Sequence, residues 1–257
     1  HLINPDEKDD LLRHLGYHHP RTIVIPNGVR VSDFAHLPPA GTFRRAFSLP
    51  EEKKLVLFLS RLNRKKGLDL LLPAFKQYCD ENLDALLIIA GPDDGYEAQV
   101  RAFVAEHALT DSIRLVGMLT GDIKRAALAD ADVFVLPSYS EGLSIAVLEA
   151  MAAGTPILVS DRVGFGDVLR QRQAAYTVEL TVDSVRAGLA ALLQSDYLRE
   201  QLAANARRLV GEAYDIDVVA GRMLAEYSMI IRSKGNSGLP VTEPHKPGTQ
   251  QPDPTIR

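Results

Sequence analysis

The chain has 257 residues, of which 46% are hydrophobic and 24% charged, with a formal net charge of −4 at neutral pH. This composition is that of an ordinary globular protein with one large or two small domains, and its mildly acidic balance excludes the broad basic surface that a nucleic-acid partner requires. No apolar run approaches the ~20 residues of a membrane span, and a single cysteine, Cys79, excludes an internal disulfide and fits a reducing, cytoplasmic setting.

Strand and helix patterns alternate along most of the chain. The expected strands are residues 22–30, 55–59, 85–90, 113–116, 132–136 and 156–159. The expected helices are residues 67–80, 95–107, 121–130, 142–153, 183–193, 196–210 and 215–231. This alternation predicts an α/β fold, a Rossmann-like parallel sheet with helices on both faces and a helical C-terminal end. Ligands of such sheets bind at the carboxyl ends of the strands.

A basic loop follows the apolar strand at residues 55–59. Four cations stand there, Arg61, Arg64, Lys65 and Lys66. Cations at the carboxyl end of a parallel strand indicate a nearby anion, and a diphosphate fits the forked donors of arginine and the compact charge of lysine. A solvated basic loop is the alternative and suits Arg64 and Lys65. For Arg61 and Lys66 the phosphate role is favoured.

The next loop begins with Gly91, directly after the strand at residues 85–90. A glycine lets the backbone approach a ligand closely. An ordinary strand-to-helix turn explains the same residue equally well, so both interpretations stay open.

Residues 138–156 are the most informative stretch of the chain. Glu141 and Gly142 stand at the start of a predicted helix, and Glu149 follows within it among apolar residues. The open amides of the helix start, at Leu143 and Ser144, suit an anion. The two carboxylates suit hydroxyl groups on either side of that anion, which predicts a nucleotide sugar as ligand. The alternatives are that the helix dipole favours Glu141 and that Glu149 is a solvated helix residue.

Asp130 and Asp132 have the spacing of an Asp-x-Asp metal motif. They precede the strand at residues 132–136, however, and so are expected at the edge of the sheet opposite the site. We expect them to cap or precede this strand rather than to bind a metal ion.

The motifs together resemble the retaining glycosyltransferases of the family-four group (glycosyl transferases group 1), which have the two-domain GT-B fold. Glu141, seven residues, Glu149 and then Ala-Met-Ala-Ala-Gly-Thr-Pro match the family pattern. Arg61 and Lys66 match its Gly-Arg-x-x-x-x-Lys-Gly pattern, with Ser60 in place of the first glycine. The resemblance extends over about residues 20–231.

The resemblance implies transfer of a sugar from a nucleotide-diphosphate sugar to a glycan, lipid or small-molecule acceptor, with retention of configuration and without a metal or other cofactor. Arg61, Lys66 and Glu141 would be catalytic, the cations on the diphosphate and the acid on the donor sugar. Glu149 would hold the ribose diol. The remaining donor-binding residues would be Gly142, Leu143, Ser144, Gly91 and Met118.

The resemblance also implies a domain organisation. Residues 1–21 would be a remnant or linker of a missing N-terminal acceptor domain, and residues 22–231 would be the donor-binding domain. Residues 232–257, rich in Pro, Gly, Ser and Gln, are predicted to be a disordered tail. The missing domain leaves a peripheral membrane contact open. It also leaves an alternative function, a non-catalytic nucleotide-sugar-binding module that acts through a partner chain.

Overall fold

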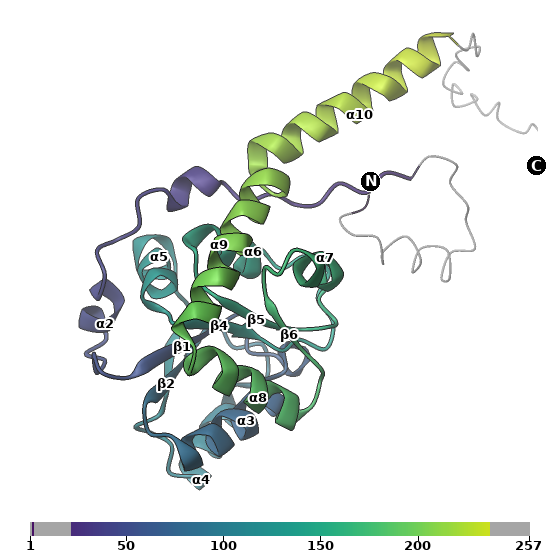
Figure 1. Cartoon of the computed structure of the whole chain (residues 1–257). Helices are drawn as coiled ribbons and strands as arrows, with labels where there is room; N and C mark the ends of the chain where they lie inside the picture. The colour runs from purple at the N-terminus through teal and green to yellow at the C-terminus, as the bar shows by residue number, and fades with distance from the viewer. Residues whose placement is uncertain (1, 3–21, 237–257) are drawn as a thin grey trace, which may run out of the picture.

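A computed structural model describes Leu2 and residues 22–236 (Figure 1). Among these residues, six parallel strands form one sheet in the order β3-β2-β1-β4-β5-β6. The strands are β1 (Lys54–Leu59), β2 (Ala85–Ala90), β3 (Ile113–Gly117), β4 (Val133–Leu136), β5 (Ile157–Ser160) and β6 (Tyr176–Val178). The predicted Rossmann-like sheet is therefore confirmed.

Helices cover both faces of the sheet. Those that connect consecutive strands are α3 (Leu68–Glu81), α4 (Glu97–Glu106), α5 (Gly121–Asp130), α6 (Ile145–Ala153) and α7 (Gly166–Gln171). The helical C-terminal end comprises α8 (Val182–Leu193), α9 (Asp196–Ala213) and α10 (Ile216–Asn236). Helix α8 packs against α3, whereas α9 packs against α6 (Figure 1). The C-terminal helices thus complete both layers around the sheet.

The strand order reverses between β1 and β4. The chain proceeds outward from β1 through β2 to β3, then returns to place β4 on the other side of β1. In open α/β sheets a crevice for ligands forms at the carboxyl ends of the two strands on either side of such a reversal. Leu55 to Phe58 of β1 are fully buried, as expected for a strand covered on both faces.

The predicted strand at residues 22–30 is wrong. Val24 and Val29 form only isolated bridges, with Leu2 and Asp215. The amide of Val29 donates to the carbonyl of Tyr214 at 2.9 Å, so the segment is tied to the chain just before α10. Pro26 lacks an amide donor, and the Asn-Gly pair after it favours a turn, so a continuous ladder cannot form.

Several helix boundaries also differ from the prediction, and α9 continues to Ala213 rather than ending at residue 210. Helix α6 begins at Ile145 instead of residue 142, because Glu141 forms a bridge with Val163 that keeps the preceding loop out of the helix. Helix α10 continues to Asn236 rather than ending at residue 231. The rest of the predicted tail, 237–257, and nearly all of the predicted linker, residues 1 and 3–21, lie outside the described residues.

Several short elements were not predicted. These are the 3₁₀ helices η1 (Val31–Phe34) and η2 (Arg64–Lys66), helix α2 (Thr42–Ala46), α7 and β6.

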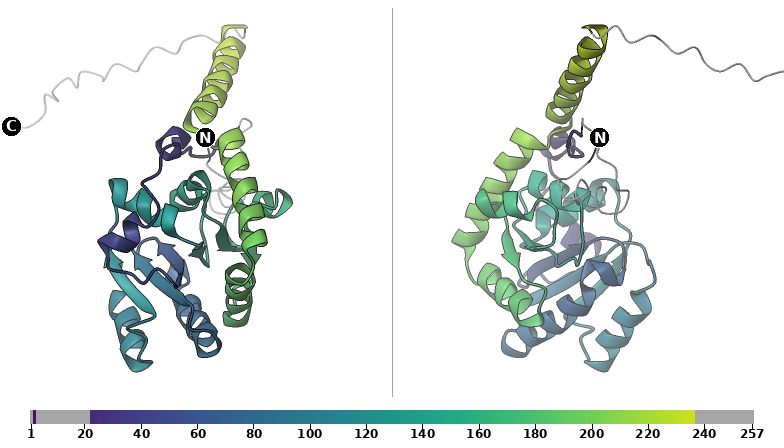
Figure 2. Two further views of the ribbon diagram at one scale, coloured as in Figure 1. Left: turned by 60° about the vertical axis from the view of Figure 1, so that its left-hand side comes forward. Right: turned by 90° about the vertical axis from the view of Figure 1, so that its right-hand side faces the viewer.

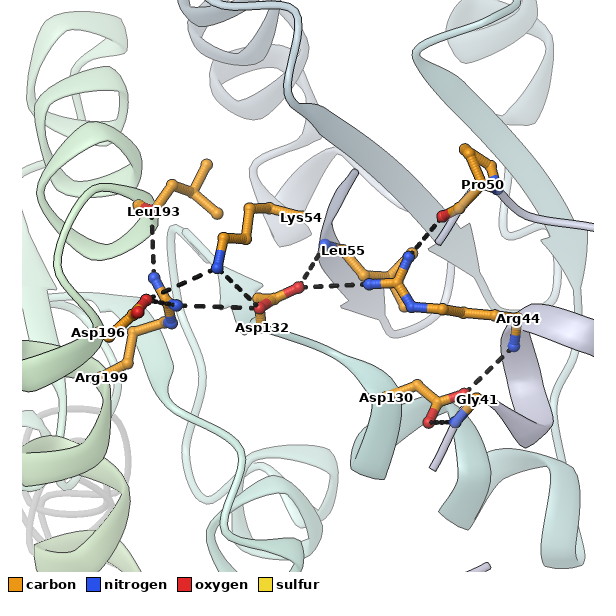
Figure 3. A network of polar contacts seen from close by, with 10 residues as sticks. All are labelled: Gly41, Arg44, Pro50, Lys54, Leu55, Asp130, Asp132, Leu193, Asp196 and Arg199. Carbon is orange, nitrogen blue, oxygen red and sulfur yellow. Dashed lines mark hydrogen bonds and ion pairs between the residues drawn. The ribbon is translucent and has the colours of Figure 1, made fainter. Parts of the chain in front are cut away.

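Asp130 and Asp132 have structural roles, as predicted (Figure 3). Asp130 is the last residue of α5, and its carboxylate caps α2. It accepts hydrogen bonds from the backbone amides of Gly41 at 2.7 Å and Phe43 at 2.8 Å. Asp132 precedes β4 and accepts the amide of Leu55 at 2.7 Å. Both lie at the amino ends of the strands, at the edge opposite the carboxyl ends.

Asp132 is the centre of an ionic network. Its carboxylate lies 3.4 Å from Arg44, 3.7 Å from Lys54 and 3.9 Å from Arg199. The guanidinium of Arg199 is buried and also donates to the carbonyl of Leu193 at 3.1 Å (Figure 3). The network joins β1, β4, α2 and α9, because its members come from these elements or their ends.

Helix α10 leaves the body of the molecule in its second half (Figures 1 and 2). Leu224, Tyr227 and Ile231, which share one helical face, are exposed there. Within residues 22–236, no helix combines the length and the apolar character needed to cross a bilayer.

Candidate functional site

The loops that follow β1 and β4 pack directly on each other at the point where the strand order reverses. The carbonyl of Lys65 accepts hydrogen bonds from the amide of Tyr139 and the hydroxyl of Ser138, both at 2.8 Å. Gly67 has φ +76°, and a Cβ there would lie 1.9 Å from the carbonyl oxygen of Pro137. Only glycine allows this approach, so the two loops are held in one arrangement.

This packing brings Lys66 and Glu141 together. Their side chains form an ion pair and are only 14% and 15% exposed. Two of the three predicted catalytic residues are therefore brought together, at the carboxyl ends of β1 and β4 where the strand order reverses. The carboxylate neutralises the lysine here, and an anionic ligand would compete with it for the ammonium group.

Arg61 lies in the same loop but contacts a different partner. Its guanidinium pairs with Asp94 at 2.8 Å and is 65% exposed. Asn63 supports Asp94 by donating to its backbone carbonyl at 3.2 Å. The sequence analysis missed Asp94, whose only local signal is its position in the loop after β2.

Gly91 brings the loop after β2 against the loop after β1. It has φ +146°, and a Cβ there would lie 1.8 Å from the carbonyl oxygen of Ser60. The close approach that requires glycine at this position is thus a contact within the protein. Its amide also donates to the carbonyl of Gly117 at 2.9 Å, which links it to the end of β3.

The residues around these loops are fixed by local hydrogen bonds. The amides of Glu97, Tyr96 and Gly95 donate to one oxygen of Asp93, and they hold the pKa of this carboxyl below its ordinary value. Burial raises the pKa of Tyr139, and so does the hydrogen bond that its hydroxyl donates to Asp69 at 3.0 Å.

Glu149 is paired and largely buried. Its Oε1 lies 2.6 Å from Nζ of Lys124 on α5, and the two side chains are 15% and 27% exposed. The interpretation of Glu149 as a solvated helix residue is therefore wrong. Lys124 was missed by the sequence analysis, because nothing local marks its contact with a residue on the next helix.

Glu149 also lines a cavity of about 300 Å³. The other residues that line this cavity are Gly121, Lys124, Arg125, Ile145 and residues 28–30, 33 and 34. The cavity thus lies between the starts of α5 and α6 and the segment that contains Gly28.

The start of α6 supplies the remaining predicted residues. Gly142 and Leu143 lie in the loop before it, and Ser144 is its N-cap without a side-chain capping bond. The first amides of the helix have no acceptor within it. Leu143 and Ser144 are buried, whereas Met118, just after β3, is 67% exposed. Met118 shares the sheet edge with the site, but none of the contacts among described residues links it to the charged pairs.

The loops after β1 and β4 thus place the Lys66–Glu141 pair before the start of α6, whereas Arg61 pairs with Asp94 and Glu149 pairs with Lys124. Within the described part of the chain, no group of three or more His, Cys, Asp or Glu side chains could hold a metal ion.

The chain is similar to known proteins over most of its length. The family model described as "Glycosyl transferases group 1" matches residues 40–209. A phosphatidyl-myo-inositol mannosyltransferase of Mycobacterium leprae is 34% identical over 214 residues, which are 82% of this chain and 54% of that protein. A relative from Methanocaldococcus jannaschii, described as an uncharacterized glycosyltransferase, is 29% identical over 194 residues, which are 75% of this chain and 49% of that protein. The chain spans about half the length of these curated relatives.

Solved structures share the fold. Sucrose-phosphate synthase from Thermosynechococcus elongatus superposes with a TM-score of 0.76 at 22% identity, over 90% of this chain and 58% of that one. Anabaena HepE in complex with UDP and glucose gives 0.79 at 15% identity, over 88% of this chain and 62% of that one. The sheet and its helices therefore match GT-B glycosyltransferases, and with the match of the family model they show that this chain belongs to the glycosyl transferases group 1 family.

Proposed function

We propose that this chain carries the donor-binding half of a retaining glycosyltransferase that uses a nucleotide-diphosphate sugar. The observation that carries the proposal is the Lys66–Glu141 pair at the carboxyl ends of β1 and β4, just before the start of α6. A cation, a carboxylate and free helix amides at one place suit a diphosphate next to a sugar. Crystal structures of Anabaena HepE are complexes with UDP and glucose and with UDP-glucose, which supports this class of ligand.

In this proposal the site stabilises the leaving diphosphate. Negative charge grows on the diphosphate as its bond to the anomeric carbon breaks. Lys66, Arg61 and the amides at the start of α6 would stabilise that charge as it develops, in the role that a metal ion has in other enzymes.

The carboxylates have separate roles in the proposal. Glu141 orients hydroxyl groups of the donor sugar, and Glu149 binds the ribose diol. Because Glu141 is paired with Lys66 in the structure, the arriving diphosphate would take over the lysine and leave the carboxylate to the sugar.

The acceptor belongs to the part of the enzyme outside this chain in the proposal. The relative from Mycobacterium leprae is described as acting on phosphatidyl-myo-inositol, a lipid. Lipid, glycan and small-molecule acceptors are all compatible with the donor site, and a lipid acceptor would bring the enzyme to a membrane surface.

Replacing Lys66 by methionine tests the donor site. We expect calorimetry with UDP, GDP and ADP to show binding of at least one of them to the unmodified chain. Lys66→Met should weaken that binding by about 10- to 100-fold, because a charge-assisted hydrogen bond contributes about 1.5–3 kcal/mol.

Lys76→Met is the matched control, since Lys76 pairs with Asp80 at 2.7 Å in the second half of α3, away from the loop that contains Lys66. The double variant Lys66→Met with Glu141→Gln separates the lost attraction from repulsion by the unpaired carboxylate. The proposal fails if none of the three nucleotides binds, or if Lys66→Met binds as tightly as Lys76→Met does.

Arg61→Ala should have a smaller effect than Lys66→Met, about 3- to 10-fold. The Arg61 side chain is 65% exposed, so solvent and salt screen its charge, whereas Lys66 is largely buried. Titrations at low and high ionic strength should show that the contribution of Arg61 falls with added salt more steeply than that of Lys66. An effect of Arg61→Ala equal to that of Lys66→Met would contradict this order.

A further inference from the structure

Glu149 is a carboxylate on an otherwise apolar helix. Val147, Leu148, Ala150 and Met151 around it on α6 are fully buried. Burying a charged carboxylate in such surroundings costs desolvation free energy unless a cation and hydrogen bonds compensate its charge. Lys124 from α5 provides this compensation at 2.6 Å.

The pairing engages one side of the carboxylate. Lys124 contacts Oε1, and among the described residues no donor reaches Oε2. The same two residues lie in the wall of the 300 Å³ cavity between the starts of α5 and α6. Among the residues that the structure describes, Lys124 thus holds one oxygen of Glu149, and the second oxygen accepts no hydrogen bond in a side chain that lines the cavity.

We infer that Lys124 is a positioning residue that fixes Glu149 for the ribose diol of the donor, an inference that rests on the proposed function. A diol is recognised by a carboxylate whose orientation is set, and a glutamate side chain without a partner would lose rotamer freedom on binding. Lys124 restricts those rotamers before the ligand arrives, which is preorganisation. Lys124 thereby sets selectivity for ribose rather than contacting the reacting atoms.

A pair of nucleotides that differ only in the diol tests the inference. We expect the unmodified chain to bind UDP about 10-fold more tightly than its 2′-deoxy analogue dUDP, and Glu149→Gln to abolish this ratio. Lys124→Met should reduce the ratio to about 1–3, and Lys124→Arg should restore most of it. If GDP or ADP binds more tightly than UDP, the ribose and deoxyribose forms of that nucleotide replace the pair.

The ratio separates positioning from other roles. If Lys124→Met weakens UDP and dUDP by the same factor, Lys124 acts on the phosphates, the base or the fold, and the inference is wrong. Lys76→Met, which removes another lysine–carboxylate pair, should leave both affinities and their ratio unchanged. Circular dichroism verifies folding, and Lys124→Gln replaces Lys124→Met if the latter fails to fold.

The experiment can contradict the inference about Lys124 without contradicting the proposed function. Suppose that nucleotide binding depends on Lys66 but that Lys124→Met does not change the ratio of the UDP and dUDP affinities. This result contradicts only the role of Lys124. A ratio that survives Glu149→Gln overturns the ribose role of Glu149 and the inference together. Absence of binding by UDP, GDP and ADP overturns both the inference and the proposed function.

Discussion

Gly67→Ala is expected to lower the free energy of unfolding by at least about 3 kcal/mol. An alanine at φ +76° has a strained left-handed backbone, which costs about 1–2 kcal/mol. The added Cβ would also lie 1.9 Å from the carbonyl oxygen of Pro137, a backbone atom that can move only if the loop moves. Urea denaturation followed by circular dichroism measures the change.

Gly95→Ala is the matched control for Gly67→Ala. Gly95 has φ +87°, and a Cβ there meets nothing within 4 Å. This variant therefore carries the backbone strain without the collision. We expect a loss of about 1–2 kcal/mol from Gly95→Ala. Equal losses in the two variants would show that the contact between Gly67 and Pro137 is not tight.

Gly67→Ala should affect binding as well as stability. Moving the two loops apart breaks the hydrogen bonds that the Lys65 carbonyl accepts from Ser138 and Tyr139. The Lys66–Glu141 pair depends on the same packing, so affinity for nucleoside diphosphates should fall in the fraction that stays folded.

Asp132→Ala should also lower the free energy of unfolding, by about 3 kcal/mol. Removing one partner of a buried ion pair leaves the remaining charges uncompensated, which typically costs 3–5 kcal/mol. The Asp132 side chain is 22% exposed, so we expect the lower end of this range. Arg44 and Arg199 would lose a counter-ion, and the amide of Leu55 would lose its acceptor.

Asp80→Ala is the control for Asp132→Ala. Asp80 is 57% exposed and pairs with Lys76 one turn earlier on α3, and exposed helix pairs of this kind contribute about 0.3–0.5 kcal/mol. Asp132→Asn, which keeps an acceptor for Leu55 but removes the charge, should fall between the two. A loss from Asp132→Ala no larger than that from Asp80→Ala would show that the network does not stabilise the fold.

The sheet could be predicted because its central strands carry their own signal. The apolar runs of β1 and β2 are long enough to mark strands buried on both faces. Strand β6, by contrast, has three residues and lies at the edge of the sheet, so its pattern is too short to recognise. At residues 22–30 the sequence pattern predicts a strand that the structure does not contain. The β-branched residues before Pro26 favour a strand, but the proline interrupts it.

The proximity of Lys66 and Glu141 could be predicted, but the partners of Arg61 and Glu149 could not. Lys66 and Glu141 follow two strands that the reversal of the sheet places side by side, so topology alone brings them near each other. Asp94 and Lys124 became visible only in the structure, because their pairing depends on how loops and helices pack. No spacing rule relates Lys124 to Glu149, which lies on the next helix of the chain.

The Asp132 network and the Lys66–Glu141 pair lie at opposite ends of the strands. Strands of four to six residues, such as β4 and β1, separate the two by about 13–20 Å. Substitutions that far apart, without shared partners, have effects on free energy that usually add. Substitutions in the loops around Lys66 should therefore change ligand binding while the Asp132 network keeps its full contribution to the free energy of unfolding.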